Sequence, residues 1–179
     1  LLALDPDISV PVLAERLDTP GVLDWFVMTE LFSVHAQTAL PHLRRKALEG
    51  TWRERARAFR ALEILRDTRA LEACVAGLED PEPAVRAAAA RAVGEMPARG
   101  RLGAPDRAVP WLERLLEDPA PGVRAAAAYA LGQMEASAAL SRLPDLLRDE
   151  AAPVRDAAAL ALVFFGDRAV EPVTRFMDP

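Results

Sequence analysis

Apolar residues recur along most of this chain at the three- and four-residue spacing that places them on one face of a helix. Clear examples are Val85, Ala89, Val93 and Met96, followed by Val123, Ala127, Leu131 and Met134. A proline stands just before each of three such segments, at Pro83, Pro121 and Pro153. Proline is tolerated there because the first turn of a helix has no internal partner for its N–H groups. The pattern therefore predicts helices that begin near these prolines.

These helical segments are copies of one another. The chain reads ERARAFRALEIL at 54–65, VRAAAARAVGEM at 85–96, VRAAAAYALGQM at 123–134 and VRDAAALALVFF at 154–165. Their arginines, Arg55, Arg86, Arg124 and Arg155, are separated by 31, 38 and 31 residues. A second helical pattern precedes each copy, at 39–49, 70–80, 108–118 and 139–149. Two-helix units repeated at this period predict a solenoid, in which each unit covers the apolar face of the next.

An acidic residue stands six positions before each repeat arginine, namely Glu49, Asp80, Asp118 and Asp149. Arginine in the first turn of a helix opposes the helix macrodipole, so its recurrence there predicts a compensating anion. The turn carboxylate is the natural partner. If the pairs stack from one repeat to the next, bidentate guanidinium–carboxylate bonds form a ladder along the loops. We interpret this ladder as structural and exclude its residues from any active site.

The hairpin, the Asp-to-Arg spacing, the prolines Pro41 and Pro110 and the block V-R-A-A-A-A-x-A-[VL]-G together resemble HEAT repeats over residues 36–179. The alanine-rich form is similar to the bacterial phycobilisome-lyase-type (E-Z) HEAT-like subgroup. This resemblance implies an all-α, right-handed superhelix of about five helical hairpins. It is specific for the fold and not for the activity, since one fold carries many functions.

The whole chain, 1–179, is expected to be one solenoid. Residues 1–35 form a degenerate repeat, ISVPVLAERLD followed by TPGVLDWFVMTELFSV, in which Asp24 stands six positions after Asp18 where arginine is expected. The head LLALDPD and the tail DRAVEPVTRFMDP read as parts of incomplete repeats, so we expect an excerpt truncated at both ends. The longer interval contains an insertion at 97–105, PARGRLGAP, which predicts a loop between repeats.

The composition favours a folded soluble protein over a disordered or membrane protein. With 51% hydrophobic and 27% charged residues and a net charge of −5, the chain has the balance of a folded soluble protein. Cys74 has no second cysteine for a disulfide, and no membrane span or signal peptide is present, so we expect a cytoplasmic protein. His35 and His42 are seven residues apart without a third ligand. No catalytic, metal or cofactor site and no small-molecule ligand is predicted.

The concave face of a solenoid, lined by the second helices, is the predicted binding surface. One position of those helices reads Arg60, Arg91, Tyr129 and Leu160, and a neighbouring position reads Ile64, Glu95, Gln133 and Phe164. Residues that vary where their surroundings repeat are candidates for partner contacts. We therefore predict a non-enzymatic scaffold that binds another protein through Arg60, Arg91, Glu95, Tyr129 and Gln133.

Two alternatives remain open. The lyase-type resemblance implies a bilin lyase, an isomerase, or an accessory subunit of such an enzyme. A DNA-binding protein is the second alternative, because basic residues gather at 42–46 and at Arg53, Arg55, Arg57 and Arg60. Against DNA, the sequence pI is about 5.2, and Glu49, Glu54 and Glu63 are interleaved with these charges.

Overall fold

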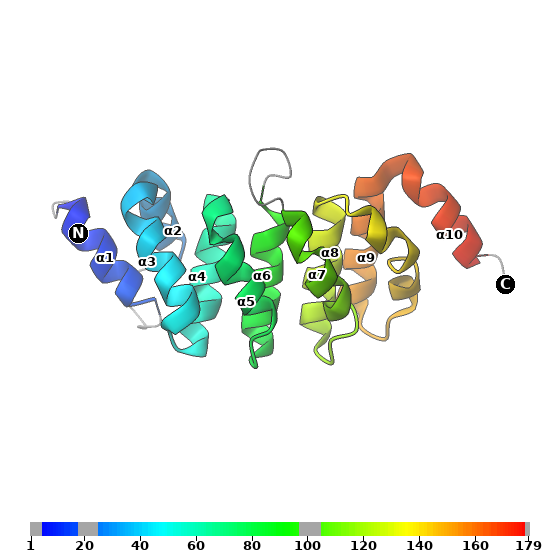
Figure 1. The fold of residues 1–179 in the computed structure, drawn as a ribbon, viewed down its shortest axis with the longest axis horizontal. Coiled ribbons are helices and arrows are strands. Elements are labelled where there is room, and N and C mark those ends of the chain that lie inside the picture. The colour runs from blue at the N-terminus through cyan, green and yellow to red at the C-terminus, as the bar shows by residue number, and fades with distance from the viewer. Residues whose placement is uncertain (1–4, 18–24, 97–104, 178–179) are drawn as a thin grey trace.

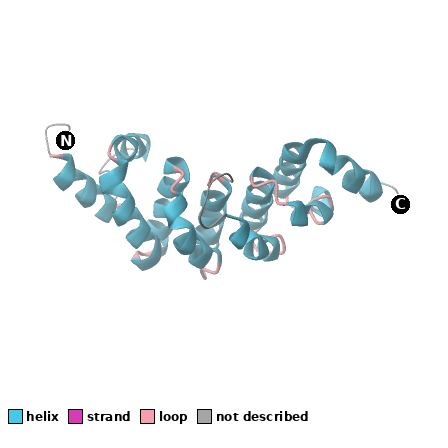
Figure 2. Ribbon diagram, turned by 45° about the horizontal axis from the view of Figure 1, so that its top comes forward, coloured by secondary structure: helices cyan, strands magenta, loops and turns pink. Residues whose placement is uncertain are grey.

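The computed structural model describes residues 5–17, 25–96 and 105–177 of the chain. Throughout these ranges the secondary structure is helical and contains no strand. Figure 1 shows the helices standing side by side in one row, with the two termini at its opposite ends. Figure 2 shows that the row bends into an arc. The predicted all-α solenoid is confirmed.

Five hairpins, each with a first and a second helical arm, make up the described part of the row. They are α1 (Pro6–Glu15) with α2 (Trp25–Val34), α3 (Ala36–Glu49) with α4 (Trp52–Leu65), α5 (Leu71–Leu78) with α6 (Pro83–Gly94), α7 (Val109–Leu115) with α8 (Pro121–Gln133), and a 3-10 segment with α9 (Ala152–Phe165). Short 3-10 turns lead into α5 at Thr68–Ala70, into α7 at Pro105–Ala108 and into α10 at Gly166–Ala169. Helix α10 (Val170–Met177) continues the row as a first arm.

Between hairpins, helices stack mainly on like helices. First arms make the series α1, α3, α5 and α7, while second arms make the series α2, α4, α6, α8 and α9. Each hairpin therefore buries its apolar face against its two neighbours, as expected of a solenoid. The prolines predicted at or before helix starts fit this scheme. Pro83, Pro121 and Pro153 lie in the first turns of α6, α8 and α9.

Alanine and glycine allow the second helices to approach closely. Five of the buried residues of α8 are alanines, at positions 125–128 and 130. A Cβ atom added to Gly94 would lie 2.7 Å from the Cα atom of Ala130, and one added to Gly132 would lie 2.5 Å from the Cα atom of Ala161. Such distances leave no room for a side chain, so the two glycines set the spacing of α6, α8 and α9.

The predicted ladder of arginine and aspartate is confirmed between hairpins, but each bridging arginine pairs with the aspartate of the next hairpin and not with the carboxylate of the acidic residue six positions before it. Arg86 donates from Nε and Nη2 to the Asp118 carboxylate at 2.8 and 2.9 Å, and its Nη1 donates to the carbonyl oxygen of Asp80 at 2.9 Å. Arg124 bonds Asp149 in the same way, with both distances 2.8 Å. Arg55 bonds Asp80 at 2.7 and 2.9 Å. Each guanidinium thus ties its own turn to the turn of the next hairpin.

Two details of the ladder differ from the prediction. Glu49 does not take part: it lies 3.7 Å from Arg45, and Arg55 Nη1 donates instead to the carbonyl oxygen of Gly50 at 2.8 Å. An unpredicted bridge joins Arg44 on α3 to Asp67, with Nη2 to Oδ1 at 2.8 Å. Asp67 also caps the turn that leads into α5, and its side chain is almost fully buried.

The predicted helix at 139–149 is wrong in detail. This segment consists of two 3-10 turns, Ser137–Ser141 and Asp145–Arg148. Pro144 lies between them, where its missing N–H and its ring weaken a continuous α-helix. Leu143 is nevertheless fully buried, so the segment packs as a first arm. Two predictions concern residues outside the described ranges. One is the irregular ladder position at Asp18 and Asp24, and the other is the insertion, of which residues 97–104 are not described.

Candidate functional site

Four of the five predicted contact residues lie on second arms, and Glu95 follows directly after one. Arg60 on α4 and Arg91 on α6 are exposed. Glu95 at the end of α6, and Tyr129 and Gln133 on α8, are half-buried. The repeat places them there because each stands five or nine residues after its repeat arginine. The structure brings three of them into direct contact.

Glu95, Tyr129 and Gln133 form one hydrogen-bonded cluster between two hairpins. Glu95 Oε1 accepts from the Tyr129 hydroxyl at 3.2 Å and from Gln133 Nε2 at 3.1 Å. Gln133 Nε2 also donates to the Tyr129 hydroxyl at 2.6 Å. The Tyr129 ring meets the Phe164 ring of α9 edge to face, with centroids 6.0 Å apart. Side chains from three consecutive second helices are therefore held in fixed positions.

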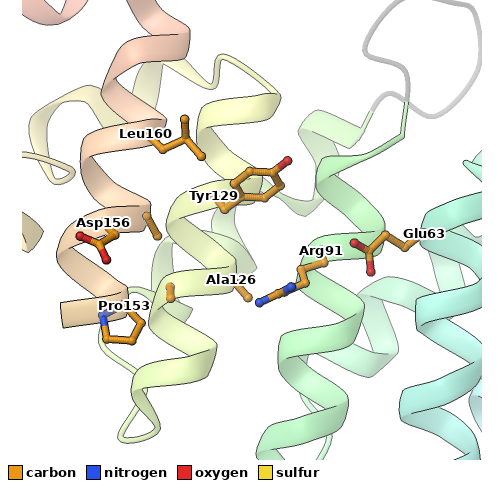
Figure 3. A pocket seen from close by; sticks show the side chains of 9 residues that line it. Glu63, Arg91, Ala126, Tyr129, Pro153, Asp156 and Leu160 are labelled. Carbon is orange, nitrogen blue, oxygen red and sulfur yellow. The ribbon is translucent and has the colours of Figure 1, made fainter. Parts of the chain in front are cut away.

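A shallow hollow of about 330 Å³ lies next to this cluster and spans α4 to α9. Its lining mixes small apolar side chains with isolated charges: Glu63, Arg91, Ala125, Ala126, Tyr129, Pro153, Asp156, Ala157 and Leu160. Figure 3 shows the Arg91 side chain extending from α6 toward Ala126 on α8, with Leu160 and Asp156 on α9 beyond it. The small side chains of α8 keep the hollow open.

Glu63 on α4 was not among the predicted residues, although it lines the hollow. Burial raises the pKa of this carboxyl, and nearby Glu95 acts in the same direction, whereas Arg91 and Arg60 oppose the rise. Glu63 stands eight residues after Arg55, the position that Gly94 and Gly132 occupy in the next two repeats. The sequence did contain a signal for Glu63, because a carboxylate stands there at a position where the next two repeats have glycine.

The basic residues that suggested DNA binding are largely engaged within the protein. Arg44 pairs with Asp67, Arg45 with Glu15, Lys46 with Glu15 and Glu54, and Arg55 with Asp80. Arg57 donates to the carbonyl oxygen of Leu17. Arg53 lies over the Trp52 ring, 4.7 Å from its centroid. Each of these basic side chains therefore has a partner within the protein.

The two histidines and the cysteine, which could in principle bind a metal or react, lie in the following surroundings. His42 Nδ1 lies 4.0 Å from Glu15, and His35 precedes the first turn of α3. Within the described ranges no group of three or more His, Cys, Asp or Glu side chains could hold a metal ion. Cys74 is fully buried in α5, and burial raises the pKa of its thiol. Among the described helices, none is long and apolar enough to cross a membrane.

Solved structures with the same fold include protein-binding and peptide-binding repeat proteins. A chain of the complex of CpcE and CpcF of phycocyanin lyase from Nostoc sp. PCC7120 is 23% identical, with a TM-score of 0.75, covering 86% of this chain and 97% of that one. A designed armadillo repeat protein in complex with the peptide (KR)4 is 17% identical, with a TM-score of 0.65, covering 94% and 87%. An engineered protein is 18% identical, with a TM-score of 0.60, covering 94% and 85%.

At these identities the structural likeness establishes the fold alone. No curated protein matches the chain by sequence. Two sequence models of HEAT repeats do match it, one over residues 70–96 and the other over residues 98–163. These ranges contain hairpins α5–α6 and α7–α8 and extend into α9. The chain is therefore a HEAT-repeat protein, similar in fold to a subunit of phycocyanin lyase.

Proposed function

We infer that the chain is a non-enzymatic scaffold that binds a protein partner along the inner face of its arc. The observation that carries this proposal is the cluster of Glu95, Tyr129 and Gln133, which fixes polar side chains across adjacent hairpins. A surface whose side chains are already ordered loses little conformational entropy when a partner binds. Tyrosine and arginine, here Tyr129 and Arg91, are the residue types that most often dominate interface energies.

The test is a pair of substitutions on this face, Arg91→Ala with Tyr129→Ala, measured against a partner identified by affinity capture and then purified. We expect the double variant to weaken binding by about tenfold or more, measured by titration calorimetry, because central Arg and Tyr residues each contribute on the order of 1–2 kcal/mol. Arg114→Ala is the matched control, since Arg114 is an exposed residue of a first arm, α7.

Tyr129→Ala also removes a half-buried ring, so folding must be measured alongside binding. Tyr129→Phe keeps the ring and its edge-to-face contact with Phe164 while removing the hydroxyl that bonds Glu95. A folded double variant that binds the partner as tightly as the unchanged protein would disprove the proposal. So would an Arg114→Ala variant that loses as much affinity as the double variant.

A second candidate, a bilin lyase subunit, is favoured by the likeness in fold to the phycocyanin lyase chain, 97% of which is matched. It is tested by mixing the purified chain with a bilin and following the absorption spectrum, with and without an acceptor protein. A spectral shift followed by covalent attachment to the acceptor would support the lyase role and reject a purely scaffolding one. An unchanged spectrum would reject the lyase role for this chain alone.

A further inference from the structure

The hollow on the inner face carries opposite charges on its two sides. Arg91 stands on α6 and Asp156 on α9, and both are exposed. Within the described part of the chain neither makes a hydrogen bond or an ion pair. The Arg91 guanidinium extends over Ala126 and away from α4 (Figure 3), although the Glu63 carboxylate is close enough to affect it electrostatically.

Between these two charges the lining is apolar. Ala125, Ala126 and Ala157 give small side chains, and Leu160, 44% exposed, stands at the edge on α9. An apolar side chain of a partner would lose water there against four aliphatic side chains. The hollow is open to the inner face, so an extended segment that lies along the row of helices can reach it.

We propose that the partner is an extended segment with an acidic side chain on Arg91, an apolar side chain in the hollow and a basic side chain on Asp156. This inference rests on the proposed function and names the chemistry of the partner. The helices that carry the charges, α6 and α9, are two spacings apart, roughly 16–20 Å at 8–10 Å per spacing. The Arg91 guanidinium reaches over α8, so the charged groups themselves are closer than their helices. An extended chain covers about 3.3 Å per residue, so the two charged residues of the segment are at most about six positions apart, with the apolar residue between them.

Charge complementarity favours this mixed segment over a uniform one. A carboxylate can bond the Arg91 guanidinium in a bidentate manner, while an ammonium group is attracted to the Asp156 carboxylate. A wholly acidic segment would place one carboxylate against Asp156. A wholly basic segment would place one cation against Arg91. Each uniform segment therefore gains one attractive contact and one repulsive contact.

The experiment uses short peptides with blocked termini, titrated into the isotope-labelled full chain and followed by NMR chemical shifts. The mixed probes are EGSLSGK and its reverse, KGSLSGE, because either chain direction can place the two charges correctly. The comparison probes are EGSLSGE, KGSLSGK and EGSSSGK. On the unchanged protein we expect a mixed probe to bind roughly two- to fivefold more tightly than any comparison probe, the range of an exposed ion pair.

Charge reversal makes the test specific. We expect Arg91→Glu to make KGSLSGK the tightest probe, Asp156→Lys to make EGSLSGE the tightest, and the double reversal to restore preference for the mixed probes. Arg91→Gln, which adds no carboxylate near Glu63, should remove the preference for an acidic residue and guards against misfolding of Arg91→Glu. An order of affinities that is the same in every variant would overturn the inference. Absence of any shift with the mixed probes at about 5 mM, a millimolar dissociation limit, would overturn it as well.

Failure of this inference can be told apart from failure of the scaffold role. If Arg91→Ala with Tyr129→Ala loses the purified partner but the peptide preferences do not reverse, the inner face binds a partner of different chemistry. If that double variant retains the partner, the scaffold role itself is wrong.

Discussion

Replacing Arg124 by alanine removes four hydrogen bonds, two to the next hairpin and two to the turn of its own hairpin. The guanidinium donates twice to Asp149, at 2.8 Å each, and its Nη1 donates to the carbonyl oxygens of Asp118 and Pro119 at 2.9 and 3.3 Å. Arg124 itself is only 8% exposed. The substitution leaves the Asp149 carboxylate without its cation in a largely buried position.

The expected loss follows from this geometry. Removing one partner of a buried ion pair costs about 3–5 kcal/mol. Asp149 keeps one bond, from the Ala151 N–H at 2.9 Å, and lies at the protein edge, so we expect the lower end of the range, about 3 kcal/mol. For a chain of this size each kcal/mol lowers the melting temperature by about 2–4 °C, which gives a decrease of about 6–12 °C.

The assay is thermal and urea unfolding followed by circular dichroism. Arg114→Ala is the matched control, because Arg114 lies 3.4 Å from Glu79 with both side chains more than half exposed, and such a pair contributes less than about 0.5 kcal/mol. A double-mutant cycle with Asp149→Ala isolates the pairwise contribution. An Arg124→Ala protein that melts within 1 °C of the parent, or a cycle without coupling, would refute the ladder as a stabilising element.

Two further substitutions test packing and charge. Gly132→Ala should lower the free energy of unfolding by about 1–3 kcal/mol, because the added Cβ would lie 2.5 Å from the Cα atom of Ala161. Gly122→Ala is the control: a Cβ there would have no atom within 4 Å, so this change should be neutral or stabilising. Equal urea midpoints for the two variants would contradict this expectation. Glu63 has a raised pKa in the folded state, so its ionisation costs stability as pH rises above the unfolded value of about 4.3. Glu63→Gln should therefore raise the melting temperature at pH 7 and not at pH 3.5, and a decrease at pH 7 would count against this assignment.

The repeat made most of the fold predictable. The copies around Arg55, Arg86, Arg124 and Arg155 located α4, α6, α8 and α9 to within about two residues, because each combines a proline or cap with regular apolar spacing. The acidic residue before each arginine predicted the inter-hairpin bridges at Asp80, Asp118 and Asp149. Periodicity failed at 139–149, where the apolar spacing suits a helix but the chain forms two 3-10 turns on either side of Pro144.

The site was predictable in position and not in its contacts. Repeat register placed Glu95, Tyr129 and Gln133 on one face, but their bonding depends on how closely α6 and α8 pack. Gly94 determines that distance through a contact with Ala130 that is remote in sequence. Glu63 was missed because its role arises from burial between hairpins. The burial of Glu63 depends on how the stacked helices are aligned, and a single sequence does not show that alignment.

The three guanidinium bridges at Asp80, Asp118 and Asp149 all lie at one edge of the solenoid, where first arms turn into second arms. Glu95 and Gln133 lie at the other ends of α6 and α8. Helices α6 and α8 are therefore tied at both edges, by ion pairs where the arms turn and by the hydrogen bond from Gln133 to Glu95 at the opposite ends. A segment that binds across α6 and α8 therefore meets a surface whose curvature is held at both ends of these helices.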